Sequence, residues 1–280
     1  MKRILVPTDF SVTARQALIY AQKWAVPHKD ATIHVVHMYT PAVEAEYPNV
    51  APPVPEYIRM REKQLMEFVK ECKAECAPEL DRNVRITQEL IIGFPADEIV
   101  KLSEHCDLIV MGTKGQTDLL DRWFGSVSSN VAKRAKCPAV LVPKGVSFKE
   151  IKQIVYAVNY ESAEKEAIEQ LLAINKDLEA NVHFLHVAEE EDKEAFTKNK
   201  AELFEGLFED GIPEFSFTME EVPGEDISET ISNYAIEHGI DLVVMATPQR
   251  SFWERFFHKS QSRKMALTTK LPLMIYHITG

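Results

Sequence analysis

The sequence predicts an α/β fold made of two tandem, open, five-stranded parallel sheets with helices on both faces. Short apolar runs alternate with helical stretches along the chain, which is typical of parallel strands covered on both sides. The same order of elements occurs twice within 280 residues. Each copy therefore takes ~140 residues, which is a normal domain size.

The strands of the two copies correspond one to one. Each copy opens with a short apolar strand and closes with Pro followed by an apolar run. The expected strands are residues 2–9, 32–37, 84–91, 107–111 and 138–142 in the first copy, and residues 152–159, 181–186, 215–222, 241–245 and 272–276 in the second.

Helical stretches rich in Ala, Leu and Ile separate these strands. They are expected at residues 13–25 and 95–105 of the first copy, at residues 162–174 and 225–238 of the second, and in a long stretch after each second strand. Residues 40–56 hold five prolines and predict a long surface loop.

A polar stretch with one glycine, Lys144 to Ser147, follows the last strand of the first copy. We expect the domain boundary there, with domains at residues 1–146 and 150–280.

Composition excludes several classes of protein. The apolar stretches are strand-sized and too short for a membrane helix, and the chain runs from Met1 almost directly into its first strand. A cytoplasmic protein without a membrane partner is therefore expected.

The net charge of −11 is uneven, +2 over residues 1–149 and −13 over the rest. An acidic second half argues against a nucleic-acid partner.

No residue set predicts a metal site. Cys72 and Cys76 are one helical turn apart but lack further ligands at a familiar spacing, so a plain helix face is favoured. The strand histidines His37 and His186 recur with the repeat and favour ordinary hydrogen bonds at strand ends.

A glycine pattern follows the fourth strand of the first copy: Gly112, two residues, Gly115, nine residues, then Gly125-Ser126. Glycines let backbone N–H groups approach phosphate oxygens closely. The Gly-Ser pair opens a helix, and a helix N-terminus favours anions. Together these features predict a phosphate-binding loop.

Asp9 ends the first strand and lies in the same site if the first and fourth strands are neighbours. Its carboxylate then accepts hydrogen bonds from ribose hydroxyls. Alternatively, Asp9 caps the helix that begins near Ser11. The spacing leaves both interpretations open.

The motifs favour binding over catalysis. Neither a Walker A loop nor the dinucleotide fingerprint occurs, and no motif places a general base near the phosphates. Two alternatives stay open. One is a slow ATP hydrolase or phosphotransferase using Lys114, Ser126 and a divalent ion, and the other is an interaction scaffold that needs no nucleotide.

At these residues the chain resembles the universal stress protein (UspA) family in its tandem form. The glycine pattern matches the family's ATP-binding pattern in full, and residues 4–11 and 137–142 resemble its first and last strands. The resemblance implies an adenine-nucleotide alpha-hydrolase-like fold and a stress-response role through nucleotide-dependent regulation or partner binding.

The resemblance also implies a ligand and its contacts. The ligand is ATP, alone or with Mg²⁺. Pro7 and Thr8 line the adenine and ribose end, Asp9 binds ribose, and Met38 and Met111 flank the base. The residues around the phosphates are Gly112, Lys114, Gly115, Gly125, Ser126, Val127 and Ser128.

The second copy departs from the pattern at each key point. Asn159 stands for Asp9, Ala246 for Gly112, and Gln249 for Gly115. We expect it to bind ATP weakly or not at all. The resemblance further implies antiparallel pairing of residues 138–142 with 272–276, which makes the chain a pseudo-dimer, and two chains can associate further as a homodimer.

Overall fold

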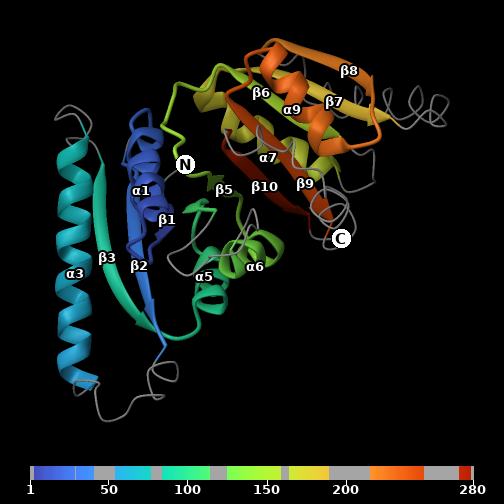
Figure 1. Ribbon diagram of the computed structural model, residues 1–280. Helices are drawn as coiled ribbons and strands as arrows, with labels where there is room; N and C mark the ends of the chain where they lie inside the picture. The colour runs from blue at the N-terminus through green and yellow to red at the C-terminus, as the bar shows by residue number, and fades with distance from the viewer. Residues whose placement is uncertain are drawn as a thin grey trace. The chain divides into compact units, whose positions relative to one another are not determined.

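The computed structural model of the chain describes residues 3–28, 30–40, 54–76, 84–113, 125–158, 164–188, 215–248 and 271–278. The chain divides into two units, Met1–Phe148 and Lys149–Gly280 (Figure 1), and each contributes five parallel strands.

Five parallel strands form the sheet of the first unit, in the order β3-β2-β1-β4-β5. Their bounds are β1 (Arg3–Pro7), β2 (Thr32–Tyr39), β3 (Arg85–Ile92), β4 (Leu108–Gly112) and β5 (Ala139–Val142). Strands β1, β4 and β5 are buried almost throughout, which explains their continuous apolar runs. Strand β3 lies at the edge and is half-exposed, so its sequence is more polar.

Helices cover both faces of this sheet. They are α1 (Val12–Ala25), α3 (Val54–Glu75), α5 (Pro95–Ser103) and α6 (Ser126–Arg134). Helix α1 contacts α3, and α5 contacts α6. The chain moves from β1 to β2 and β3 in one direction and then returns to β4 and β5. Right-handed crossovers in opposite directions place the two helix pairs on opposite faces.

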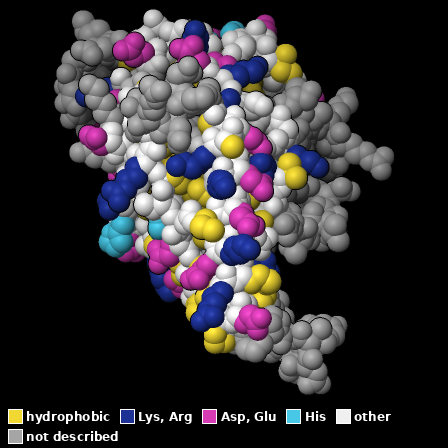
Figure 2. Space-filling view, turned by 90° about the vertical axis from the view of Figure 1, so that its left-hand side faces the viewer, with side chains coloured by type: hydrophobic (Ala, Val, Ile, Leu, Met, Phe, Trp, Pro, Cys, Tyr) yellow, Lys and Arg dark blue, Asp and Glu magenta, His cyan; other side chains and the backbone are white. Residues whose placement is uncertain are grey.

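The outer surface of α3 carries charges of both signs. Figure 2 looks onto this side of the unit and shows basic and acidic side chains interspersed along the helix. Lys63 and Glu67 form one such pair at 3.9 Å, one helical turn apart. On the described part of this surface the two signs of charge are therefore mixed.

The second unit repeats the topology, in the order β8-β7-β6-β9-β10, with parallel neighbours throughout. Its elements are β6 (Gln153–Val158), α7 (Glu164–Leu178), β7 (Asn181–Ala188), β8 (Phe217–Pro223), α9 (Ile227–Glu237), β9 (Leu242–Pro248) and β10 (Leu273–Ile278). The predicted α/β class with two five-stranded parallel sheets is confirmed.

The repeat extends to single hydrogen bonds. The Asp107 carboxylate accepts from the amide of Arg3 at 2.8 Å, where β1 begins. At the matching place in the second unit, the Asp241 carboxylate accepts from the amide of Gln153 at 3.1 Å, and also from the preceding amide of Lys152 at 2.9 Å. An aspartate at the corresponding position thus fixes the start of the first strand in both copies.

The proline-rich segment differs from expectation. Helix α3 begins at Val54, so residues 54–56 are helical rather than part of the proline-rich loop. Proline is compatible with the first turn of a helix, because the amides there have no partner within the helix, and Pro55 occupies such a position. The rest of that predicted loop, 41–53, lies outside the described residues.

Among the described residues, no helix combines the length and the apolar character needed to cross a membrane.

Candidate functional site

The carboxyl ends of β1 and β4 lie side by side and form the edge at which the candidate site is built. The two strands are parallel neighbours, with Ile4 opposite Leu108 and Leu5 opposite Ile109. Strand order reverses here, and open α/β sheets bind ligands at such a reversal. The strands are adjacent, as a site shared by Asp9 and the glycine pattern requires.

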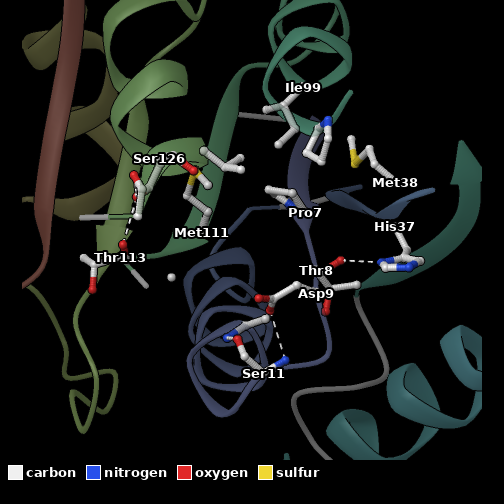
Figure 3. Close-up of a pocket in the computed structure, with 16 residues that line it drawn as sticks. Pro7, Thr8, Asp9, Ser11, His37, Met38, Ile99, Met111, Thr113 and Ser126 are labelled. Carbon is white, nitrogen blue, oxygen red and sulfur yellow. Dashed lines mark hydrogen bonds between the residues drawn. The ribbon is translucent and has the colours of Figure 1, made fainter. Parts of the chain in front are cut away.

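A cavity of about 240 Å³ opens at this edge (Figure 3). Its walls come from the ends of three strands and from the first turns of three helices. They are formed by Pro7, Thr8, Asp9, Ser11, Ala14, His37, Met38, Pro95, Ile99, Met111, Gly112, Thr113, Gly125, Ser126, Val127 and Ser128.

Local hydrogen bonds shape the turn that carries Asp9. The Thr8 hydroxyl accepts from the amide of Phe10 at 3.0 Å, and Asp9 Oδ1 accepts from the amide of Ser11 at 3.0 Å. The N-cap of α1 is Ser11, whose hydroxyl accepts from the amide of Ala14 at 3.1 Å. Asp9 is therefore not the helix cap. Its carboxylate shapes the preceding turn and lines the cavity.

The first turn of α6 faces the cavity without a side-chain cap. Its N-cap is Gly125, which has no side chain to accept from the amides that follow. These amides belong to Ser126, Val127 and Ser128, and all three residues line the cavity. Uncapped amides at a helix N-terminus carry partial positive charge and bind anions such as phosphate.

Hydrogen bonds join the two ends of the glycine pattern. The Thr113 carbonyl accepts from the amide of Gly125 at 2.7 Å and from the hydroxyl of Ser128 at 2.8 Å. Ser128 is 2% exposed. Its hydroxyl therefore bonds the carbonyls of Thr113 and Gly125, the described residues on either side of positions 114–124, whereas Ser126 is exposed.

The cavity has an apolar end and a polar end. In Figure 3, Met38, Ile99 and Pro7 gather at one end, while Ser126 and Thr113 lie at the other. Met38 of β2 and Met111 of β4 are 8% and 6% exposed, so their side chains form walls rather than free surface. A ligand with a flat apolar group and an anionic group fits this polarity.

His37 joins the site from β2. Its Nδ1 lies 2.8 Å from the carbonyl oxygen of Thr8. A carbonyl can only accept, so Nδ1 carries the proton. Burial lowers the pKa of His37, as does the charge of Arg61, against the opposing effects of the Thr8 hydrogen bond and Asp9. The matching His186 lies 3.1 Å from the carbonyl oxygen of Val158. Both histidines make ordinary hydrogen bonds at strand ends.

The structure brings most of the predicted site residues together. All of them line the cavity except Lys114 and Gly115, which lie outside the described residues. The cavity also includes residues that motif reasoning missed: Ser11, Ala14, His37, Pro95, Ile99 and Thr113. The recurrence of a strand-end histidine in both copies was a usable signal for His37. Pro95 and Ile99 follow the third strand, whose end meets the same edge.

Described positions of the second unit carry side chains where the first has glycine or a small polar group. Strand register matches Gly112 with Ala246 and Thr8 with Val158, both about 5% exposed. Asn159 and Gln249, the counterparts of Asp9 and Gly115, lie outside the described residues.

Comparison with known proteins gives a consistent match over both units. The model of the universal stress protein family matches residues 1–143 and again residues 150–277. A universal stress protein of Methanocaldococcus jannaschii is 32% identical over 147 residues, covering 51% of this chain and 82% of the relative. One from Thermus aquaticus is 33% identical over 148 residues, covering 50% of this chain and 98% of the relative.

A solved structure resembles the whole chain. It is a universal stress protein from Archaeoglobus fulgidus, with a TM-score of 0.70 and 19% sequence identity, covering 99% of this chain and 96% of that one. At this identity the likeness shows the fold. The two-unit architecture thus has an experimentally determined counterpart.

Proposed function

The chain belongs to the universal stress protein family, in tandem form, and from that premise we propose that its first unit binds ATP and that its second unit does not. Membership of the family supports a role in stress response. The observation that carries the proposal is the cavity at the β1–β4 edge, where an apolar slot, a carboxylate and an uncapped helix N-terminus meet.

Residues that line the cavity suit each part of the nucleotide. Met38, Met111 and Ile99 offer apolar surface to a purine ring. The Asp9 carboxylate suits ribose hydroxyls, which are donors. The amides of Ser126 and Val127 suit the phosphates, because the α6 N-terminus favours negative charge. Mg²⁺ would accompany the phosphates as part of the ligand.

The proposed single site follows from the departures of the second unit. Ala246 replaces the glycine at the end of the fourth strand, and Val158 replaces the hydroxyl-bearing Thr8. Pro248 lacks the amide that Lys114 has in the first copy. These replacements remove hydrogen-bond donors and add bulk, so the second unit is proposed to serve structure or regulation.

We propose binding rather than turnover as the working role, with ATP changing a surface that a partner recognises. A bound nucleotide would contact both Thr113 and Gly125, the two ends of segment 114–124. Ligation would thereby link these two ends, and we propose that a partner recognises the liganded form. The cytoplasmic location and the pairing of chains remain predictions from the sequence.

Isothermal titration of the full chain with ATP, with and without Mg²⁺, tests the proposal. One site per chain is expected, with affinity reduced in Ser126→Ala. The matched control is Ser260→Ala, at the corresponding place in the second copy, which should leave the affinity unchanged. ATP at 100 times Kd should stabilise the fold by about 2.7 kcal/mol. Absence of binding, or two equal sites, would overturn the proposal.

Phosphate release under the same conditions decides between binding and hydrolysis. We expect no release that scales with protein concentration. Release that scales with protein and disappears in Asp9→Ala would replace the binding role with that of an ATP hydrolase.

A further inference from the structure

We propose that His37 is a positioning residue of the nucleotide site, which fixes the orientation of the Thr8–Asp9 peptide through its hydrogen bond to the Thr8 carbonyl. This inference rests on the proposed function, because it assigns a role in ATP binding. It adds a residue that lies outside the glycine pattern and belongs to a different strand.

The Thr8 backbone is bound to β2 at two points. Its amide donates to the carbonyl of Val36 at 2.8 Å, which continues the β1–β2 ladder by one residue. Its carbonyl then accepts from His37 Nδ1 at 2.8 Å. Thr8 is 6% exposed, so without His37 its carbonyl would have to find another donor in a largely dry place.

The peptide orientation matters because of what lies on its other side. No peptide bond among the described residues is cis, so the carbonyl of Thr8 and the amide N–H of Asp9 point in opposite directions. Figure 3 shows the His37 ring on one side of Thr8 and Asp9, with Thr113 and Ser126 on the other. The hydrogen bond to His37 therefore keeps the Thr8 oxygen turned away from the polar end of the cavity. A flipped peptide would present that oxygen to an anionic ligand.

The turn needs such support because it contains a strained residue. Phe10 has φ of 65°, a conformation that bulky L-residues rarely adopt. Its ring packs on the His37 ring at 4.3 Å between centroids and meets Phe68 of α3 edge-on at 5.6 Å. His37 therefore stabilises the turn through two contacts, a hydrogen bond to the carbonyl of Thr8 and packing on the ring of Phe10.

The duplication supplies a matched control. His186 occupies the corresponding place in β7 and lies 3.1 Å from the carbonyl of Val158, the counterpart of Thr8. The second unit thus keeps the histidine while Gly112, Pro7 and Thr8 are replaced. Replacing either histidine removes an equivalent hydrogen bond, but only one of the two borders the proposed nucleotide site.

Three variants of the full chain test the proposal by ATP titration. His37→Leu removes the donor and should weaken ATP binding about ten-fold. His37→Asn keeps an N–H close to the position of Nδ1 and should recover most of the affinity. His186→Leu should lower the melting temperature to a similar extent as His37→Leu and leave ATP affinity unchanged.

A second measurement reports the order of the turn in the absence of nucleotide. The amides of Phe10 and Ser11 donate within the turn, so their hydrogen exchange reports its order. Faster exchange in His37→Leu, restored in His37→Asn, is expected. Wild-type affinity in His37→Leu, equal losses in His37→Leu and His37→Asn, or an equal loss in His186→Leu would overturn the positioning role. If wild-type protein fails to bind ATP while exchange still responds to His37→Leu, the proposed function is wrong and the hydrogen bond to Thr8 stands.

Discussion

Gly112 lies against Thr13 so closely that a Cβ at position 112 would stand 2.9 Å from the Cβ of Thr13 and 3.0 Å from its backbone carbon. The first glycine of the glycine pattern therefore lets the N-terminus of α1 approach the end of β4. This approach brings Ser11 and Asp9 to the same edge as Thr113. Glycine at position 112 thus has a structural reason that does not depend on any ligand.

Gly112→Ala should consequently disturb the first unit even without nucleotide. The added methyl group has to displace the backbone of α1, so we expect the free energy of unfolding to fall by about 1–3 kcal/mol. ATP affinity should fall as well. Urea denaturation and titration measure the two effects. The reverse change in the second unit, Ala246→Gly, removes a buried methyl group and should cost only about 1 kcal/mol. Unaltered stability of Gly112→Ala would contradict this account.

Asp9→Asn separates the two duties of Asp9. Asparagine keeps an oxygen that can accept from the amide of Ser11, so the turn and the melting temperature should change little. It loses the charge and half of the acceptor capacity offered to ribose, so ATP affinity should fall about ten-fold. Asp9→Ala should reduce both stability and affinity. Titration beside thermal melting distinguishes the variants, and Asp9→Asn that binds like wild type would rule out the ribose contact.

Ser126 and Ser128 should respond differently to alanine substitution. Ser128 donates to the Thr113 carbonyl and is buried, so Ser128→Ala should lower the free energy of unfolding by about 1–3 kcal/mol. Loss of this hydrogen bond should also weaken ATP binding, because Thr113 and Ser128 both line the cavity. Ser126 is exposed and lines the cavity, and we propose that its hydroxyl donates to a phosphate, so Ser126→Ala should weaken binding and leave stability unchanged. Equal stability losses in the two variants would show that the hydrogen bond from Ser128 to Thr113 does not stabilise the fold.

Acid should destabilise the second unit through His183. Burial lowers the pKa of His183 from 6.5, the neighbouring His238 adds to this, and Glu220 opposes it. The unfolded chain therefore binds a proton more readily than the folded one. The stability contribution is present above pH 6.5 and is lost as pH falls through the lowered value.

Urea denaturation at about pH 7.5 and about pH 5.5 measures this effect. His183→Asn should lose less stability than wild type over that interval, because it no longer titrates there. His183 Nε2 also lies 3.0 Å from Gln153 Oε1. For this reason the comparison is the change between the two pH values rather than absolute stability. Equal changes in both proteins would show that protonation of His183 does not cause the loss.

Much of the fold was predictable because its signals are local. Apolar runs, the helical stretches between them and the repetition of the whole pattern depend on residues near each other in sequence. The start of α3 was less predictable, because prolines suit a loop and a first helical turn equally well. The glycine spacing indicated residues at one end of the cavity, Gly112 and Gly125, for the same local reason.

The sequence by itself determined the two α/β units, the order of their strands along the chain and the position of the glycine pattern after β4. Only the tertiary structure decided how these parts meet. Gly112 packs closely against Thr13, His37 donates to the carbonyl of Thr8, and Ser128 donates to the carbonyl of Thr113. Each of these contacts joins residues that are 15 or more positions apart and depends on which strands become neighbours. A motif records residue types and spacing, whereas the direction of a peptide or hydroxyl is set by partners that folding brings from elsewhere in the chain.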